Sequence, residues 1–328
     1  MTYNYYGKKR IESVSFTKNI SFAWNKMKHL YPLHIVTMLA MSIFMFIGEG
    51  TIPISQASVR IFLNLLLLQS WTPIQCDING VSWYLCVTMF LYFLFPYILK
   101  GMERKYSVKK AKRMLLFLFL IQIAAGGIGS HIQIFSHMES TWIRQDLTSW
   151  FVYYFPPVRA IDFAIGCNLG YCFAVNGSRK LTKKETTLLE LLAILLIIVA
   201  NICSINARFR TEYGVKPPVN AYSELWWAYT IVFTISSCMI VWLFAKTERG
   251  YISEYLVNRM TVYIGNISSV TFLIHSVVFR YIEVACNLLF GLDFLFEYGK
   301  WIKLSLGFVL TIIAAQVWMA MTRRKVKL

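Results

Sequence analysis

Long apolar runs, separated by short polar segments, dominate the pattern along the chain. A helix needs about 20 apolar residues to cross the hydrocarbon core of a bilayer. Eight segments approach this length, and they are residues 31–48, 83–99, 114–129, 150–175, 187–205, 225–245, 267–290 and 301–321. A ninth run, residues 57–70, is shorter and carries Arg60 and Asn64. The pattern therefore predicts an all-α integral membrane protein with about eight transmembrane helices and one short interfacial or re-entrant helix.

The composition supports a membrane protein. Hydrophobic residues make up 57% of the 328 residues and charged residues only 15%, whereas charged residues are roughly 25% of ordinary soluble domains. We expect one membrane domain over residues 1–328, with a basic cytoplasmic segment (1–30), a helical bundle (31–321) and a basic tail (322–328). The seven cysteines form no C-x-x-C pair, so we interpret them as small buried hydrophobic residues and expect no metal site.

The basic residues occur in short clusters between the apolar runs, and they give the chain a formal net charge of +17. With the N-terminus inside, eight crossings place most Lys and Arg residues on one side of the membrane, as the positive-inside rule requires. A full crossing by residues 57–70 would break this alternation. We therefore expect both termini in the cytoplasm and contact between the basic clusters and anionic lipid, and we do not expect a nucleic-acid partner.

Charged side chains inside apolar runs are costly and suggest functional sites. Arg159 and Asp162 are three residues apart, so on a helix they share one face. Two interpretations are open. The pair neutralises itself and holds the helix after the double proline, or it forms the polar wall of a substrate cavity. In the same run, Gly166 and Gly170 have the small-residue spacing that permits close contact between helices.

His275 follows several serine and threonine residues in an apolar run. It is either a hydrogen-bonding residue within the helix packing or, because histidine titrates near neutrality, part of a proton relay. Arg280 and Glu283, on the same run, are three apart and are expected to pair. Trp83 follows a polar turn and is either an interfacial anchor or part of the mouth of a site. The sequence contains no nucleotide-binding loop, zinc-protease motif or serine-hydrolase motif.

Five stretches, in this order along the chain, resemble motifs of the acyltransferase-3 family of bacterial membrane O-acyltransferases. They are residues 25–33 (NKMKHLYPL), 63–71 (LNLLLLQSW), 81–85 (VSWYL) with Phe95-Pro96, 158–166 (VRAIDFAIG) and 267–275 (ISSVTFLIH). The resemblance implies transfer of an acetyl or other acyl group from cytoplasmic acyl-CoA to a hydroxyl of a cell-envelope glycan, lipid or small molecule. It also implies a location in the bacterial plasma membrane, and it places Trp83, Arg159 and His275 on positions that the family's motifs mark.

The chain departs from the family's pattern near its start. Residues 1–7 resemble the stretch that follows the family's second helix, so the first two helices, which include the family's catalytic histidine, are expected to be absent here. Lys26 and His29 stand where the family has two arginines. Lysine keeps the charge but lacks the guanidinium fork, and neutral histidine lacks both. His29 and His34 flank the inner end of the first span, where we interpret them as interfacial anchors.

The sequence thus predicts a membrane-bound O-acyltransferase whose activity is impaired because the family's N-terminal catalytic helix is absent. Acyl-CoA is the expected co-substrate, and His275 is the candidate catalytic residue. Two alternatives stay open: a truncated, non-catalytic pseudo-enzyme, and a multispan transporter or flippase-like protein, although the chain shows no matching broken helices in its two halves. The candidate substrate-binding residues are Trp83, Arg159, Asp162, Lys26 and His29.

Overall fold

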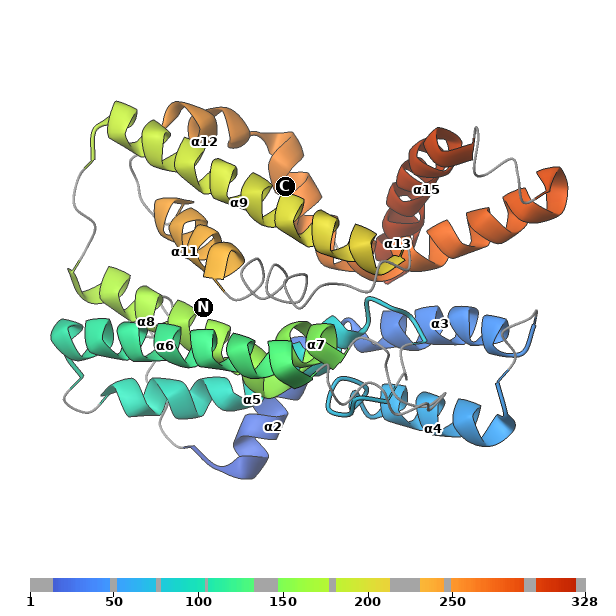
Figure 1. The fold of residues 1–328 in the computed structure, drawn as a ribbon, viewed down its shortest axis with the longest axis horizontal. Helices are drawn as coiled ribbons and strands as arrows, with labels where there is room; N and C mark the ends of the chain where they lie inside the picture. Colours follow the sequence, from blue (N-terminus) through green and yellow to red (C-terminus); the bar gives the residue numbers. More distant parts are fainter. Residues whose placement is uncertain are drawn as a thin grey trace. The chain divides into compact units, whose positions relative to one another are not determined.

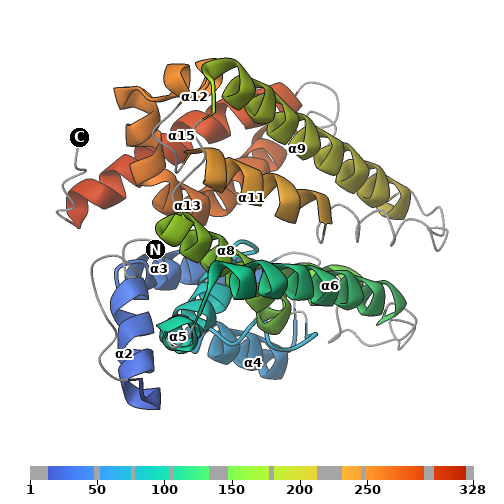
Figure 2. The same cartoon turned by 90° about the vertical axis from the view of Figure 1, so that its left-hand side faces the viewer.

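The computed structural model describes residues 14–47, 52–74, 78–103, 106–132, 147–176, 181–212, 231–244, 249–291 and 299–322. Figures 1 and 2 show these ranges as helices with short connections, and no β-strand occurs among them. The prediction of an all-α integral membrane protein is confirmed. In chain order the elements are α2 (Phe16–Met27), α3 (Tyr31–Ser42), η1 (Ile43–Met45), α4 (Ile54–Leu65), α5 (Trp83–Glu103), α6 (Val108–Ile132), α7 (Leu147–Ser149), η3 (Trp150–Tyr154), α8 (Pro156–Asn176), α9 (Lys183–Glu212), α11 (Phe233–Phe244), α12 (Tyr251–Leu256), α13 (Arg259–Phe290) and α15 (Gly299–Met321).

Six helical segments in the described ranges are long and apolar enough to cross a membrane, and each coincides with all or most of one of the eight predicted runs. The other two runs contain the shorter apolar helices Tyr31–Met45 and Phe233–Phe244. Residues 57–65 of the predicted short run belong to α4, whose 12 residues span about 18 Å, well below the roughly 30 Å of a hydrocarbon core. The six long segments are Trp83–Met102, Val108–Gly129, Leu147–Val175, Lys183–Ile202, Arg259–Phe290 and Lys303–Met321.

The chain divides into two compact units, of which the first comprises Met1–Trp24, Ser70–Gln75 and Cys86–Leu256. In this unit α6 packs along α8, and α9 packs along α11. The helices α5, α6 and α8 share an apolar cluster that excludes solvent. The buried members of this cluster are Phe95, Leu99, Met102, Ala111, Cys167 and Tyr171.

Tyr106, in the connection between α5 and α6, joins this cluster to α8 by polar contacts. Its hydroxyl donates a hydrogen bond to Oδ1 of Asn168, and its backbone carbonyl accepts one from the hydroxyl of Tyr171 at 2.8 Å. Burial raises the pKa of the Tyr106 phenol above its ordinary value. The phenol therefore keeps its proton and remains a donor.

The second unit comprises Asn25–Gln69, Cys76–Leu85 and Val257–Leu328. In it α13 packs against α15 and against α3. The contact with α15 depends on Gly307, because a Cβ there would lie 2.6 Å from Cζ of Phe279. A small residue thus lets the aromatic ring lie against the α15 backbone. The apolar cluster of this unit contains the buried residues Met38, Met45, Ala57 and Ile78.

A buried carboxylate attaches the short helix α12 to α9 in the first unit. Glu190 on α9 is 3% exposed and accepts hydrogen bonds from the backbone N–H groups of Gly250 (3.2 Å) and Ile252 (3.3 Å). Thr187 accepts one from the backbone N–H of Tyr251 at 2.9 Å. The two α9 side chains thereby satisfy three N–H groups at the start of α12, which have no acceptor within that helix.

Replacing Gly250 with alanine is expected to loosen α12 from α9. The added Cβ would lie 2.3 Å from Oε2 and 2.6 Å from Cδ of Glu190, so the carboxylate would have to move and lose N–H partners. We expect the free energy of unfolding to fall by about 1–3 kcal/mol, measured as a lower melting temperature of the purified protein in detergent. Gly265→Ala is the control, because a Cβ there meets no atom within 4 Å, and it should not lower stability. Equal melting temperatures for the two variants would contradict this role of Glu190.

Candidate functional site

An ion pair near the start of α8 forms the centre of the candidate site. Phe155 has extended backbone, and two prolines follow it and begin α8, because proline is tolerated in the first turn of a helix. Arg159 and Asp162 then lie one turn apart, and Arg159 Nη1 is 2.9 Å from Asp162 Oδ2. Their side chains are only 16% and 27% exposed. The expected sharing of one helix face is confirmed.

The Asp162 carboxylate connects three helices. Its Oδ1 accepts hydrogen bonds from Gln122 Nε2 on α6 at 2.8 Å and from Thr234 Oγ1 on α11 at 3.0 Å. Arg159 also donates through Nη2 to the carbonyl oxygen of Val152, 2.6 Å away in the π-helical turn η3. The Arg159 Nε is buried and has no hydrogen-bond partner in the described part of the chain. Of the five N–H donors of the guanidinium, the Nε–H is therefore one that these contacts leave unused.

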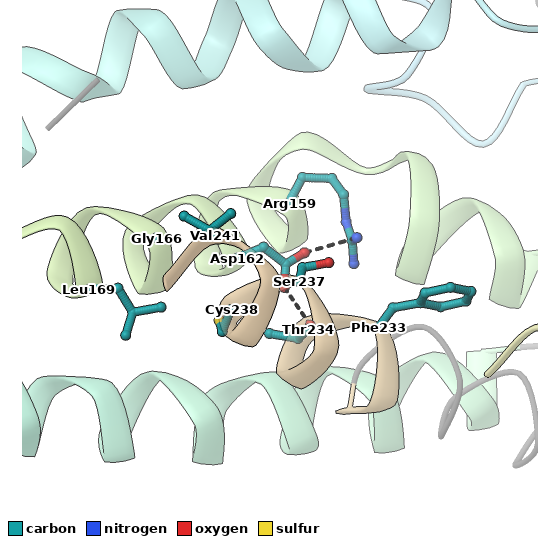
Figure 3. A pocket seen from close by; sticks show the side chains of 9 residues that line it. All are labelled: Arg159, Asp162, Gly166, Leu169, Phe233, Thr234, Ser237, Cys238 and Val241. Carbon is teal, nitrogen blue, oxygen red and sulfur yellow. Dashed lines mark hydrogen bonds and ion pairs between the residues drawn. The ribbon is translucent and has the colours of Figure 1, made fainter. Parts of the chain in front are cut away.

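The ion pair lines a cavity of about 270 Å³ between α8 and α11 (Figure 3). Arg159, Asp162, Thr234 and Ser237 supply its polar wall, and mainly apolar groups supply the rest. The pair is neutralised internally and also lines a cavity, and the binding of a substrate in this cavity stays a prediction. The lining residues are Arg159, Asp162, Gly166, Leu169, Phe233, Thr234, Ser237, Cys238 and Val241.

Several residues of this site escaped the sequence-based prediction. Gln122 had a usable signal, because it is the one amide in the apolar run 114–129. Thr234 and Ser237 had none, since hydroxyl residues are common in membrane helices. The glycine spacing permits a close helix contact, but none occurs at Gly166, where a Cβ would meet no atom within 4 Å.

A second buried polar cluster lies in the second unit and centres on His34. This side chain is fully buried, and its Nε2 lies 2.9 Å from the carbonyl oxygen of Asn64. Because a carbonyl only accepts, we assign the proton to Nε2, which leaves Nδ1 as an acceptor with no partner within the described ranges. Ser82 donates to Asn64 Oδ1 at 3.4 Å, and Gln69 donates to the Ser82 carbonyl at 3.1 Å. His34 is thus a core residue rather than the interfacial anchor expected from the sequence.

The other predicted site residues lie at separate places in the second unit. Trp83 is the first residue of α5 and is half-buried. His275 lies within α13, with Nδ1 2.7 Å from the carbonyl oxygen of Phe272 on the same helix, a contact that favours its hydrogen-bonding interpretation. Lys26 is in the last turn of α2, and His29 is exposed between α2 and α3. Roles of these four residues in catalysis or binding stay predictions. In the ranges that the structure describes, no group of three or more His, Cys, Asp or Glu side chains is placed to hold a metal ion.

The chain matches one family model over almost its whole length. The family is Acyl_transf_3, described as an acyltransferase domain, and the match covers residues 12–319. The chain therefore belongs to the acyltransferase-3 family, and the six long apolar helices among its described residues make it a multi-pass membrane protein.

A similar protein with a curated description is acyltransferase MdmB of Streptomyces mycarofaciens. It is 28% identical over 149 residues, which are 42% of this chain and 36% of that protein. The chain thus matches only about a third of this relative's length. No solved structure matches the chain.

Each single substitution in the Arg159–Asp162 pair is expected to lower the free energy of unfolding by more than half of the loss in the double variant. Asp162→Leu leaves the guanidinium without its counter-charge in apolar surroundings, so the free energy of unfolding should fall by about 2–4 kcal/mol. The double variant Arg159→Met/Asp162→Leu should cost clearly less than the two single variants added together. Unfolding of the purified protein in detergent measures these differences.

The control for this cycle is Glu254→Gln, which disrupts a pair with Lys183 whose side chains are 43% and 58% exposed. Its cost should stay below about 1 kcal/mol, as is usual for surface pairs. Additive effects of the two single substitutions would show that Arg159 and Asp162 act independently.

Proposed function

We propose that the chain is a membrane-bound acyltransferase of the bacterial plasma membrane that moves an acetyl or other acyl group from acyl-CoA to a hydroxyl. The acceptor is a cell-envelope glycan, a lipid or a small molecule. Family membership over residues 12–319 supports the proposal, because the family's model describes an acyltransferase domain. The printed name of the relative from Streptomyces mycarofaciens also describes an acyltransferase.

The observation that carries the proposal is a set of hydrogen-bond donors on a cavity between apolar helices. Acyl transfer breaks the C–S bond of the thioester, forms a C–O bond, and moves the hydroxyl proton to the departing CoA sulfur. Negative charge develops on the carbonyl oxygen in the transition state, and donors fixed in a water-poor site stabilise that charge. Arg159 and Ser237 lie on the cavity wall and carry hydrogen-bond donors of this kind.

Arg159 and Asp162 have distinct parts in this proposal. Arg159 is the candidate donor to the developing oxyanion, and Asp162 positions the guanidinium. His275, in the second unit, is assigned from its motif alone as the candidate base or proton relay. The remaining candidates for substrate binding, also assigned from the motifs, are Trp83, Lys26 and His29.

The test is transfer of radiolabelled acetyl from acetyl-CoA by the purified chain in lipid nanodiscs, with envelope lipids and glycan fragments as acceptors. Arg159→Lys keeps the charge but loses the guanidinium fork, so transfer should be about 10²–10³-fold slower. Glu254→Gln, in an exposed pair, should keep the wild-type rate. If the wild-type chain labels no acceptor and releases CoA no faster than Arg159→Lys, the proposal is wrong.

Basic residues at the start of α6 are suited to the phosphates of CoA. Lys109, Lys112 and Arg113 are exposed, and Lys110 lies 5.5 Å from the centre of the Tyr106 ring. Clustered cations raise the local concentration of a polyanion and form charge-assisted hydrogen bonds with phosphate. We therefore include this cluster in the proposal as the binding surface for the CoA nucleotide.

Reversing two of these charges should weaken donor binding. For Lys109→Glu/Lys112→Glu we expect the KM for acetyl-CoA to rise about 10-fold at low salt, and the difference to shrink at high salt as the charges are screened. Acetyl-pantetheine, which lacks the nucleotide phosphates, is the control substrate, and its KM should not change. An equal rise with acetyl-pantetheine would show that the two lysines do not act through phosphate.

A further inference from the structure

The cavity between α8 and α11 changes from polar to apolar along its length (Figure 3). The α8 residues on its wall are Arg159, Asp162, Gly166 and Leu169. Their spacing of three and four residues places them on one face of the helix. Figure 3 shows Leu169 to the left of Asp162 and Arg159, so the α8 wall begins with charged groups and ends with hydrocarbon.

The wall formed by α11 also carries its hydroxyl groups beside the ion pair. Phe233 begins this wall, Thr234 and Ser237 follow, and Cys238 and Val241 come after them. Because Thr234 donates a hydrogen bond to Asp162, the polar ends of the two walls coincide. The cavity therefore offers hydrogen-bond donors around Asp162 and apolar surface towards Leu169 and Val241.

The size and the charge of the cavity restrict its ligand. Arg159 and Leu169 are ten residues apart, which on a helix is about 15 Å. The volume of about 270 Å³ is smaller than the roughly 300–1,000 Å³ typical of pockets for drug-sized molecules. The charge of Arg159 is balanced by Asp162, so an anionic ligand finds no unpaired cation. A neutral carbonyl on a short hydrocarbon chain matches both ends.

Gly166 lies between the polar and apolar ends of the α8 wall. A Cβ at this position meets no atom within 4 Å, and the residue is in the regular helix α8. A larger side chain would therefore fit without moving the fold and would occupy the cavity itself. The size of residue 166 thus decides how much of the apolar end is open.

We propose that this cavity holds the acyl group of the donor, with its carbonyl at the Arg159 end and its hydrocarbon chain towards Leu169. Gly166 sets the longest acyl chain that the cavity accepts. The assignment rests on the proposed acyl transfer. A lipid tail has the same chemistry as the acyl chain of acyl-CoA, so the experiments compare these two sources.

Chain-length preference tests the role of Gly166. The values of kcat/KM for acetyl-, butyryl- and hexanoyl-CoA are measured for the wild type, Gly166→Val and Gly166→Leu. Each methylene excluded from the cavity should cost about fourfold, so Gly166→Leu should lower the hexanoyl-to-acetyl ratio at least about 10-fold, with Gly166→Val between. The control is Gly265→Leu, at an exposed glycine with equally open space, which should keep the wild-type ratio. An unchanged ratio in Gly166→Leu overturns the proposal.

Cysteine labelling tests occupancy of the cavity without requiring turnover. Cys238 lines the cavity, whereas Cys172 on α8 is not one of its lining residues. Saturating butyryl-CoA should slow the reaction of Cys238 with N-ethylmaleimide at least about 10-fold without slowing that of Cys172, as followed by peptide mass spectrometry. CoA without an acyl group should not protect Cys238. Protection by phospholipid alone, with no further effect of butyryl-CoA, would assign the cavity to bilayer lipid and overturn the proposal, as would an unreactive Cys238.

The two experiments also separate this assignment from the proposed function. Protection of Cys238 by butyryl-CoA in a chain that transfers no acyl group would reject the proposed function and support the binding site. Acyl transfer with an unchanged chain-length preference and no protection would reject the binding site and support the proposed function.

Discussion

A carboxylate placed among apolar helices must find its hydrogen-bond partners within the protein, because hydrocarbon supplies none. Asp162 meets this requirement with donors from three helices: Arg159 on its own helix, Gln122 on α6 and Thr234 on α11. An ionised carboxylate accepts about four hydrogen bonds, so most of its capacity is used. Satisfying one charge thereby fixes three helices against each other and leaves the polar end of a cavity between two of them.

The same requirement explains two further buried polar contacts in the described part of the chain. Glu190 reaches from α9 to the N–H groups at the start of α12, and His34 reaches from α3 to a carbonyl at the end of α4. In lipid, apolar side chains gain little by leaving one apolar surface for another, so polar contacts and close packing decide which helices associate. Gly307 on α15 provides such close packing, because it leaves room for the Phe279 ring of α13.

Features that depend on one helix were predictable from the sequence, and features that depend on two were not. Length and apolar content predicted the six long helices, and they also showed that the run 57–70 is too short to cross. Spacing within a helix predicted the ion pair of α8 and the pair of Arg280 with Glu283, whose charged atoms lie 3.7 Å apart. Gln122 joins the site only because α6 packs on α8, and no local pattern encodes that packing. His34 was misassigned for the same reason, since its burial depends on α4.

The balanced ion pair also determines which chemistry suits the cavity. An unpaired guanidinium would bind carboxylates and lipid phosphates tightly, and such anions would compete with a neutral substrate. With Asp162 beside it, Arg159 keeps its hydrogen-bond donors while the net charge of the pair is zero. A thioester carbonyl is neutral when bound and gains negative charge only in the transition state. Donors of this kind therefore bind the acyl group more tightly in the transition state than in the ground state. This difference in binding accelerates the reaction. A groove that only binds lipid does not need to bind a transition state more tightly than a ground state, and apolar walls alone would be sufficient for it.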